Sequence, residues 1–194
     1  MASNNSGVVI KKGKQSVKEL LTSLRLLVDV EVLVGFPEGT TERDVDTGEP
    51  SGITNAALAY IHDNGAPEQN IPARPFMRPA MEDSKIKAAD KLGQVLAAVI
   101  TRAAGPTVVE MGMHQVGLLV KLAIQNKINE GIPPPLADRT LQARARRGRK
   151  GAITELANRK QGLPPSTLLA KPLIDTGQMR NAANYVIRSR KQRK

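Results

Sequence analysis

The feature that most constrains the fold of this chain is a pair of long amphipathic patterns separated by Gly105-Pro106. Apolar residues recur at helical spacing over residues 79–104 and again over residues 107–129. Thr107 and Glu110 match a capping box, so we expect the second helix to begin there. Two long helices joined by so short a turn lie antiparallel, and the sequence therefore predicts an α-hairpin.

Shorter patterns on either side of the hairpin predict a small sheet. Residues 17–28 have helical periodicity behind a second capping box, Ser16 with Glu19, and residues 30–36 then alternate as a strand does. Residues 184–188 have a strand pattern that could pair antiparallel with the first. The fold class that we predict is α+β: a small antiparallel sheet packed with two long helices, with extended loops and terminal arms.

The length of 194 residues suits one domain with extensions. We expect a flexible arm over residues 1–16, a single domain over 17–188 and a basic tail over 189–194. An acidic loop at 38–52 and a basic insertion at 138–170 belong to this domain. The insertion has few large apolar residues, so we expect it to be loosely structured and to lie outside the core.

The net charge of +11 is unevenly distributed along the chain. Residues 31–70 carry eight acidic side chains and one basic one, whereas residues 138–194 carry fifteen basic and three acidic ones. If these segments lie on opposite sides of the fold, identical copies could meet acidic face to basic face. Such a heterologous contact closes into a ring when the rotation allows it. The basic segment could equally be a solvated tail.

The composition argues against several classes of protein. The absence of cysteine excludes a disulfide framework and thiolate chemistry, and it is typical of a protein made in a reducing cytoplasm. Apolar runs fall short of the roughly 18 residues that a membrane span needs, so we expect no membrane partner. With two Phe, two Tyr and no Trp, the chain has few side chains on which single-stranded nucleic acid could stack.

The triplet Asp-Thr-Gly, which begins at Asp46 and again at Asp175, is the sharpest suggestion of catalysis. Aspartic proteases need two such aspartates that share a proton and are buried by apolar neighbours. Asp46 follows a highly charged run that would not be buried. The second triplet is explained as well by a turn, in which Asp175 or Thr176 caps a short helix and Gly177 permits the turn. We therefore expect no catalytic residue.

Cofactor and metal signatures are missing from the sequence. His62 and His114 do not have the spacing of metal ligands, and each is expected to be an ordinary helix residue. No phosphate-binding loop, dinucleotide fingerprint or nucleophile elbow occurs. We expect neither a metal ion nor a cofactor.

Prolines stiffen residues 70–81, directly before the first long helix. Pro79 suits the first turn of that helix. Arg74 and Arg78 are held in fixed directions, and they could bind the acidic loop of a neighbouring copy, a DNA backbone, or carboxylates of the same chain at positions 68, 82 and 83.

The basic run 144–150 could contact phosphates, another protein or only solvent. The candidate interface residues are Arg74, Phe76, Arg78, Asp44, Asp46, Glu49, Arg144, Arg146 and Arg147.

Three segments together resemble a known family. Residues 59–65 (Ala-Tyr-Ile-His-Asp-Asn-Gly), 71–80 (Ile-Pro-Ala-Arg-Pro-Phe-Met-Arg-Pro-Ala) and 172–179 (Pro-Leu-Ile-Asp-Thr-Gly-Gln-Met) are similar in order and spacing to motifs of the tail-completion or neck proteins of tailed bacteriophages. Those proteins carry a helix that ends in glycine, a proline-arginine entry to a long helix, and an Asp-Thr-Gly element before a final strand. The acidic loop and the basic insertion depart from that pattern.

The resemblance implies a non-enzymatic virion protein, made in the host cytoplasm, that joins head to tail. It implies a homo-oligomeric ring, which we expect to be a hexamer, in contact with other neck, connector and tail proteins and with packaged DNA. The alternative that the residues leave open is a DNA-binding accessory protein that uses residues 139–150 and the basic C-terminal tail.

Overall fold

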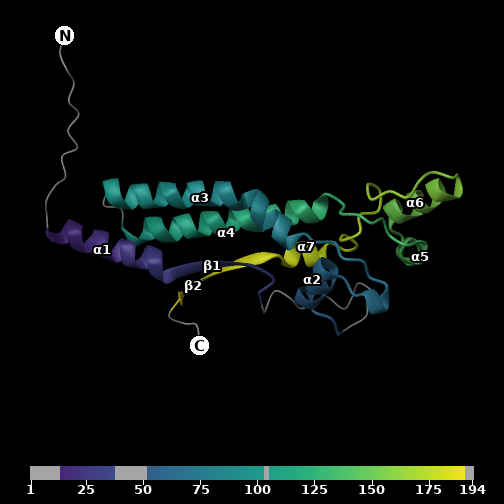
Figure 1. Cartoon of the computed structure of the whole chain (residues 1–194), viewed down its shortest axis with the longest axis horizontal. Coiled ribbons are helices and arrows are strands. Elements are labelled where there is room, and N and C mark those ends of the chain that lie inside the picture. Colours follow the sequence, from purple (N-terminus) through teal and green to yellow (C-terminus); the bar gives the residue numbers. More distant parts are fainter. Residues whose placement is uncertain (1–13, 38–51, 103–104, 191–194) are drawn as a thin grey trace, which may run out of the picture.

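The computed structural model describes residues 14–37, 52–102 and 105–190, and it shows an elongated chain built along two antiparallel helices (Figure 1). α3 (Met77–Arg102) and α4 (Pro106–Asn129) form the predicted hairpin. The expected cap at Thr107 is wrong, because α4 begins at Pro106 with Gly105 in the N-cap position. Proline at the first helical position needs no N–H partner and already has a helical φ, so it starts the helix without a capping side chain.

The predicted sheet is present and has two strands, β1 (Val30–Gly35) and β2 (Asn184–Ser189). The strands pair antiparallel, with Val30 opposite Ser189 and Gly35 opposite Asn184. Val32 and Ile187 belong to the face that packs against the hairpin. The sheet and the hairpin confirm the predicted α+β class.

α1 (Lys14–Asp29) leads directly into β1 and lies along the hairpin. It begins two residues before Ser16, so Ser16 is not the N-cap that its pattern suggested. Leu20, Leu24 and Leu27 of α1 cover a core cluster between the two long helices. That cluster consists of Val95, Val99, Val109 and Met113.

A second core cluster lies where α3 begins and α4 ends. It brings together α2 (Asn55–Asn64) and α7 (Gln178–Ala182), which lies near the end of the chain. A 3-10 turn, η2 (Pro67–Gln69), follows α2 and contributes no residue to the cluster. α2 ends at the predicted glycine, whose N–H donates to the Ile61 carbonyl oxygen at 2.7 Å. The cluster comprises Ala59, Phe76, Ala80, Val120, Ile124, Ile128, Leu173, Met179 and Ala183.

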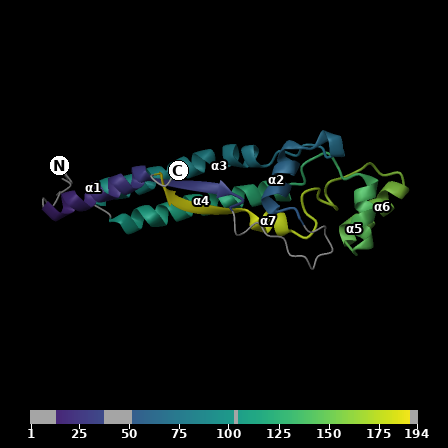
Figure 2. The ribbon, with the colours of Figure 1, turned by 90° about the horizontal axis from the view of Figure 1, so that it is seen from below.

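The basic insertion is not loosely structured, and this prediction is corrected. It forms α5 (Asp138–Arg146) and α6 (Lys150–Lys160), which occupy one end of the molecule (Figure 2). A small third cluster of Leu136, Leu141, Ala152 and Ala170 holds them together. Arginine, lysine and alanine are good helix formers, and a cluster of two leucines and two alanines is enough to join two short helices.

α4 is central to the fold, because α1, α3, α7 and both strands contact it. By length and composition alone this helix could also cross a membrane. Core helices of water-soluble proteins meet the same criterion, so the finding is weak evidence for a membrane span.

Candidate arginine site

The proline-arginine segment enters α3 as predicted, with Pro79 in the first helical turn. The cap of this helix comes from elsewhere in the chain. Asp63 Oδ1, on α2, accepts the backbone N–H of Phe76 at 2.7 Å and that of Met77 at 2.9 Å. Sequence reasoning missed Asp63, because a capping residue is normally sought directly before its helix.

Arg74 is 4% exposed and points into the molecule. Its Nε and Nη2 donate to the carbonyl oxygen of Pro134, at 3.2 and 2.8 Å. None of the three carboxylates considered from sequence is its partner: Asp83 and Glu82 pair with lysines, and Glu68 is exposed. Burial lowers the pKa of Arg74, and the nearby charge of Arg144 lowers it further.

Phe76 is fully buried and meets the ring of Phe36 edge to face, with ring centroids 6.2 Å apart. Arg74 and Phe76 therefore have internal roles in this chain and do not offer the surface that an interface needs. Of the interface candidates in this segment, only Arg78 has an exposed side chain.

Arg144 is the second buried arginine, and it fixes the turn before α7. Its Nη1 donates to the carbonyl oxygens of Lys171 at 2.9 Å and Ile174 at 2.7 Å, and its Nη2 donates to that of Pro172 at 2.9 Å. Burial lowers the pKa of Arg144, the carboxylate of Asp175 opposes that effect, and two neighbouring arginines reinforce it. Arg144 is thus another interface candidate with an internal role.

The second Asp-Thr-Gly triplet is a turn that arginines hold in place. Asp175 contacts Arg147 and accepts from Arg149 Nε at 3.0 Å. Thr176 Oγ1 accepts the N–H of Gln178 at 3.3 Å. Gly177 precedes α7 with φ 85°, a left-handed conformation that favours glycine. Thr176 and Gly177 thus shape the predicted turn, but the predicted cap is wrong: Gly177 takes the N-cap position of α7, and Asp175 binds arginines instead. The first triplet lies outside the described residues.

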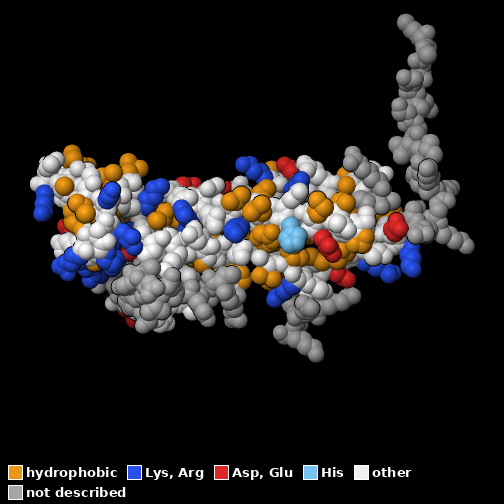
Figure 3. Space-filling view, turned by 180° about the vertical axis from the view of Figure 1, so that it is seen from behind, with side chains coloured by type: hydrophobic (Ala, Val, Ile, Leu, Met, Phe, Trp, Pro, Cys, Tyr) orange, Lys and Arg blue, Asp and Glu red, His pale blue; other side chains and the backbone are white. Residues whose placement is uncertain are grey.

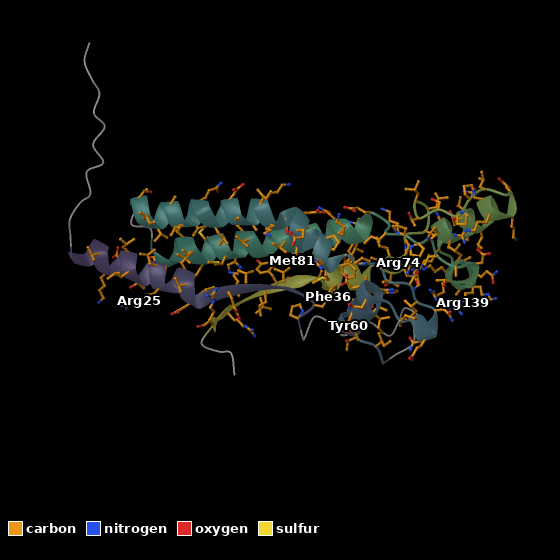
Figure 4. All side chains as sticks on the ribbon, viewed as in Figure 1. Arg25, Phe36, Tyr60, Arg74, Met81 and Arg139 are labelled. Atoms are coloured by element: carbon orange, nitrogen blue, oxygen red, sulfur yellow. The ribbon has the colours of Figure 1, made fainter. Side chains whose placement is uncertain are left out.

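These side chains surround a cavity of about 800 Å³ between the α2–α3 connection and α5. Figure 4 labels Arg74 and Arg139, which line it from these two elements. Its charged and amide walls include Arg74, Arg139, Arg144, Arg147, Asp175 and Gln178. Arg139 makes no hydrogen bond or ion pair with any residue that the structure describes. Gln178 Oε1 is buried and accepts no hydrogen bond from the same part of the chain. The cavity therefore has a cationic wall with unused donor and acceptor groups.

The remaining interface candidates that the structure describes, and the histidine His114, do not line this cavity. Arg146 is exposed on α5, whereas Asp44, Asp46 and Glu49 lie outside the described residues. His114 Nδ1 is 3.1 Å from the hydroxyl oxygen of Tyr185, which places it at the contact of α4 with β2. Within residues 14–37, 52–102 and 105–190, no group of three or more His, Cys, Asp or Glu side chains could hold a metal ion.

No protein-family model matches the chain, and neither a curated protein nor a solved structure matches it. The resemblance noted in the sequence therefore rests on the three short motifs alone. All three meet in the fold: residues 59–65 supply Ala59 to the second core cluster, residues 71–80 supply Phe76 and Ala80, and residues 172–179 supply Leu173 and Met179.

Proposed function

We propose that this chain is a structural protein of the neck of a tailed bacteriophage, a head-tail connector or tail-completion component that forms a ring at the head-to-tail junction. The observation that carries the proposal is the packing of the three motif segments into one core cluster around the end of α4. Motifs that pack together are parts of one scaffold, and this supports the proposal that their order and spacing reflect a shared fold. In this proposal the chain has no enzymatic activity, cofactor or membrane partner.

Exposed aliphatic side chains support an assembled state. Ile86 is 74% exposed, and Leu96 and Ile100 lie on the same side of α3 at helical spacing. On the outer face of the sheet, Leu33 is paired with Val186, and both are exposed. Hydrophobic side chains also remain visible along the length of the molecule in Figure 3. Extended apolar faces on a soluble protein typically mark contacts with other proteins.

The charge pattern supports contacts between identical copies. The acidic residues Asp44, Asp46 and Glu49 precede α2 in the sequence, and the exposed Arg78 and Arg146 are candidate partners on a neighbouring copy. A contact between two different surfaces of the same chain is heterologous and can close into a ring, which we propose to be a hexamer. In the virion this ring would contact other neck, connector and tail proteins.

Removal of the gene from its phage tests the proposal. We expect the lysate to contain filled heads and separate tails, with infectivity restored when the chain is supplied in trans. Electron microscopy of the lysate and plaque counts give the two readouts. Normal infectious particles in the absence of the gene would contradict the proposal.

A second candidate function is DNA binding by the end of the molecule that carries α5 and α6. Lys and Arg side chains gather there (Figure 3), and Arg139, Arg146, Lys150 and Lys160 are exposed. Phosphate contacts of this kind are independent of sequence and weaken steeply as salt rises. Duplex binding that is strongly salt-dependent, and is lost when these four residues become glutamine, would favour this function. Duplex binding that survives their replacement would count against it.

A further inference from the structure

We infer that the cavity bounded by α2, α5 and the turn before α7 is a binding site for an acidic peptide segment of another protein. The inference concerns a ligand of this chain and goes beyond the proposed place in the virion. The cavity measures about 800 Å³, which is within the usual size of a ligand site and far more than one small anion fills.

The charge of the cavity wall favours an anionic ligand. Four arginines line it, against one carboxylate, that of Asp175. Arg74 and Arg144 are anchored to backbone carbonyl oxygens, so their charges are fixed in place. Carbonyl oxygens do not neutralise a guanidinium, so the positive charge of Arg74 remains. Arg144 Nε also lies 3.9 Å from Asp175 Oδ2, but Arg147 and Arg149 share that carboxylate, so the wall keeps an excess of positive charge.

Two further arginines are available to bind the ligand. Arg139 has no partner among the described residues. Arg147 contacts Asp175 through Nη2, and its side chain is still 34% exposed. A guanidinium has more N–H donors than that contact uses, and its fork matches the two oxygens of a carboxylate. Arg139 and Arg147 are therefore the residues that we assign to carboxylate recognition.

Other groups in the wall favour a peptide over a free anion. Gln178 also lines the wall, and a side-chain amide offers both N–H donors and an acceptor oxygen to a peptide backbone. Leu58, Ile71 and Met179 give part of the wall an apolar character. A peptide that alternates acidic and aliphatic side chains fits the arginines, the Gln178 amide and the apolar wall together.

Binding is tested with the full chain and a short fluorescein-labelled peptide of alternating glutamate and leucine, followed by fluorescence polarisation. We expect saturable binding that is about tenfold weaker for Arg139→Gln, because one charge-assisted contact is lost. The matched control is Arg146→Gln, which removes an exposed arginine of the same helix that does not line the cavity. We expect this control to bind as the unaltered chain does, and melting temperatures of both variants verify that they fold.

Several outcomes would overturn the inference. Absence of binding would do so, as would equal weakening by the two substitutions, which would indicate a diffuse cationic surface. Equally tight binding of a peptide with glutamine in place of glutamate would show that charge is not recognised. Displacement of the peptide by inorganic phosphate at matching concentrations would identify a small-anion site instead. None of these results bears on the phage lysate, so the two proposals fail independently.

Discussion

Asp63 on α2 caps α3 from a distance, since its Oδ1 accepts the backbone N–H of Phe76, thirteen residues later, at 2.7 Å. A second bond to the next N–H, at 2.9 Å, makes this one carboxylate oxygen the acceptor for two N–H groups at the start of the longest described helix. The negative charge also faces the positive end of the helix dipole. α2 and α3 are thereby fixed to each other where the second core cluster forms.

Replacement of Asp63 by alanine should lower the free energy of unfolding by about 1 kcal/mol, the usual cost of a lost helix cap. Asp63→Asn keeps an acceptor oxygen and should lose less. Urea denaturation measures the change. Asp90→Ala, at an exposed position on α3, is the control. Equal effects of the alanine substitutions at 63 and 90 would mean that the cap does not stabilise the fold.

Two glycines of the hairpin should respond in opposite directions to alanine. A Cβ at Gly112 on α4 would overlap the side chain of Val95 on α3, so Gly112→Ala should destabilise the protein by about 1–3 kcal/mol. A Cβ at Gly93 meets no atom within 4 Å, so Gly93→Ala should stabilise α3 by about 0.5–1 kcal/mol. Thermal denaturation compares the two. A stabilising Gly112→Ala would show that the helices lie further apart.

Arg144→Met should loosen the attachment of α5 and α6 to the rest of the chain. Three carbonyl oxygens would lose their donors, at a total cost of about 3 kcal/mol. Hydrogen exchange should accelerate over residues 136–175 more than in α3 and α4. Arg146→Met, on the same helix but exposed, should change neither the free energy of unfolding nor the hydrogen-exchange rates over residues 136–175. Unchanged exchange in the Arg144 variant would contradict the role assigned to this guanidinium.

Lys127 joins the two long helices, because its Nζ lies 2.6 Å from Asp83 Oδ2 on α3 and 3.0 Å from Glu130 Oε1 just beyond α4. The hydrogen bonds to Asp83 and Glu130 raise the pKa of Lys127 above 10.5. Because the pKa of Lys127 is higher in the folded chain than in the unfolded chain, its positive charge stabilises the fold at pH values below the unfolded pKa. This stabilisation is lost as the pH rises through the pKa of the folded chain.

Lys127→Met should therefore cost about 0.5 kcal/mol at pH values below 10, since both carboxylates are largely exposed. The difference from the unaltered chain should shrink as pH rises beyond about 10.5. Urea denaturation across this range gives the comparison. Lys85→Met, which removes a looser pair with Glu82 at 3.8 Å, is the control. A stability difference that grows with pH would contradict the stabilising role of the Lys127 charge.

Ile86→Lys should impair assembly without unfolding the subunit. Because Ile86 is exposed, its replacement should change the free energy of unfolding by less than about 0.5 kcal/mol. Its charge would disrupt the apolar face of α3, so the variant should fail to restore infectivity to a phage that lacks the gene. Ile153→Lys, an equivalent change on α6, is the control. Full complementation by the Ile86 variant would remove this face of α3 from the proposed ring contact.

Sequence by itself determined the hairpin and the positions of the two strands, while their antiparallel pairing was one that the sequence allowed and the structure shows. The apolar residues of α3, α4 and β1 recur at spacings that belong to one kind of element, and glycine and proline mark the ends. Such signals are local, so they can be recognised before the chain is folded. The α5–α6 pair lacked that signal because its buried cluster consists of two leucines and two alanines spread over residues 136–170, a density of apolar residues that is also typical of loops.

The roles of Arg74, Arg144 and Asp63 were decided only by the tertiary structure. Arg74 binds a carbonyl oxygen 60 residues away, and the acceptors of Arg144 lie 27 to 30 residues away. Every residue has a backbone carbonyl, so these acceptors leave no mark in the sequence. The sequence around an arginine does not show whether its side chain faces solvent or a turn. Only the folded chain brings the carbonyl oxygens of the turn within hydrogen-bonding distance of it.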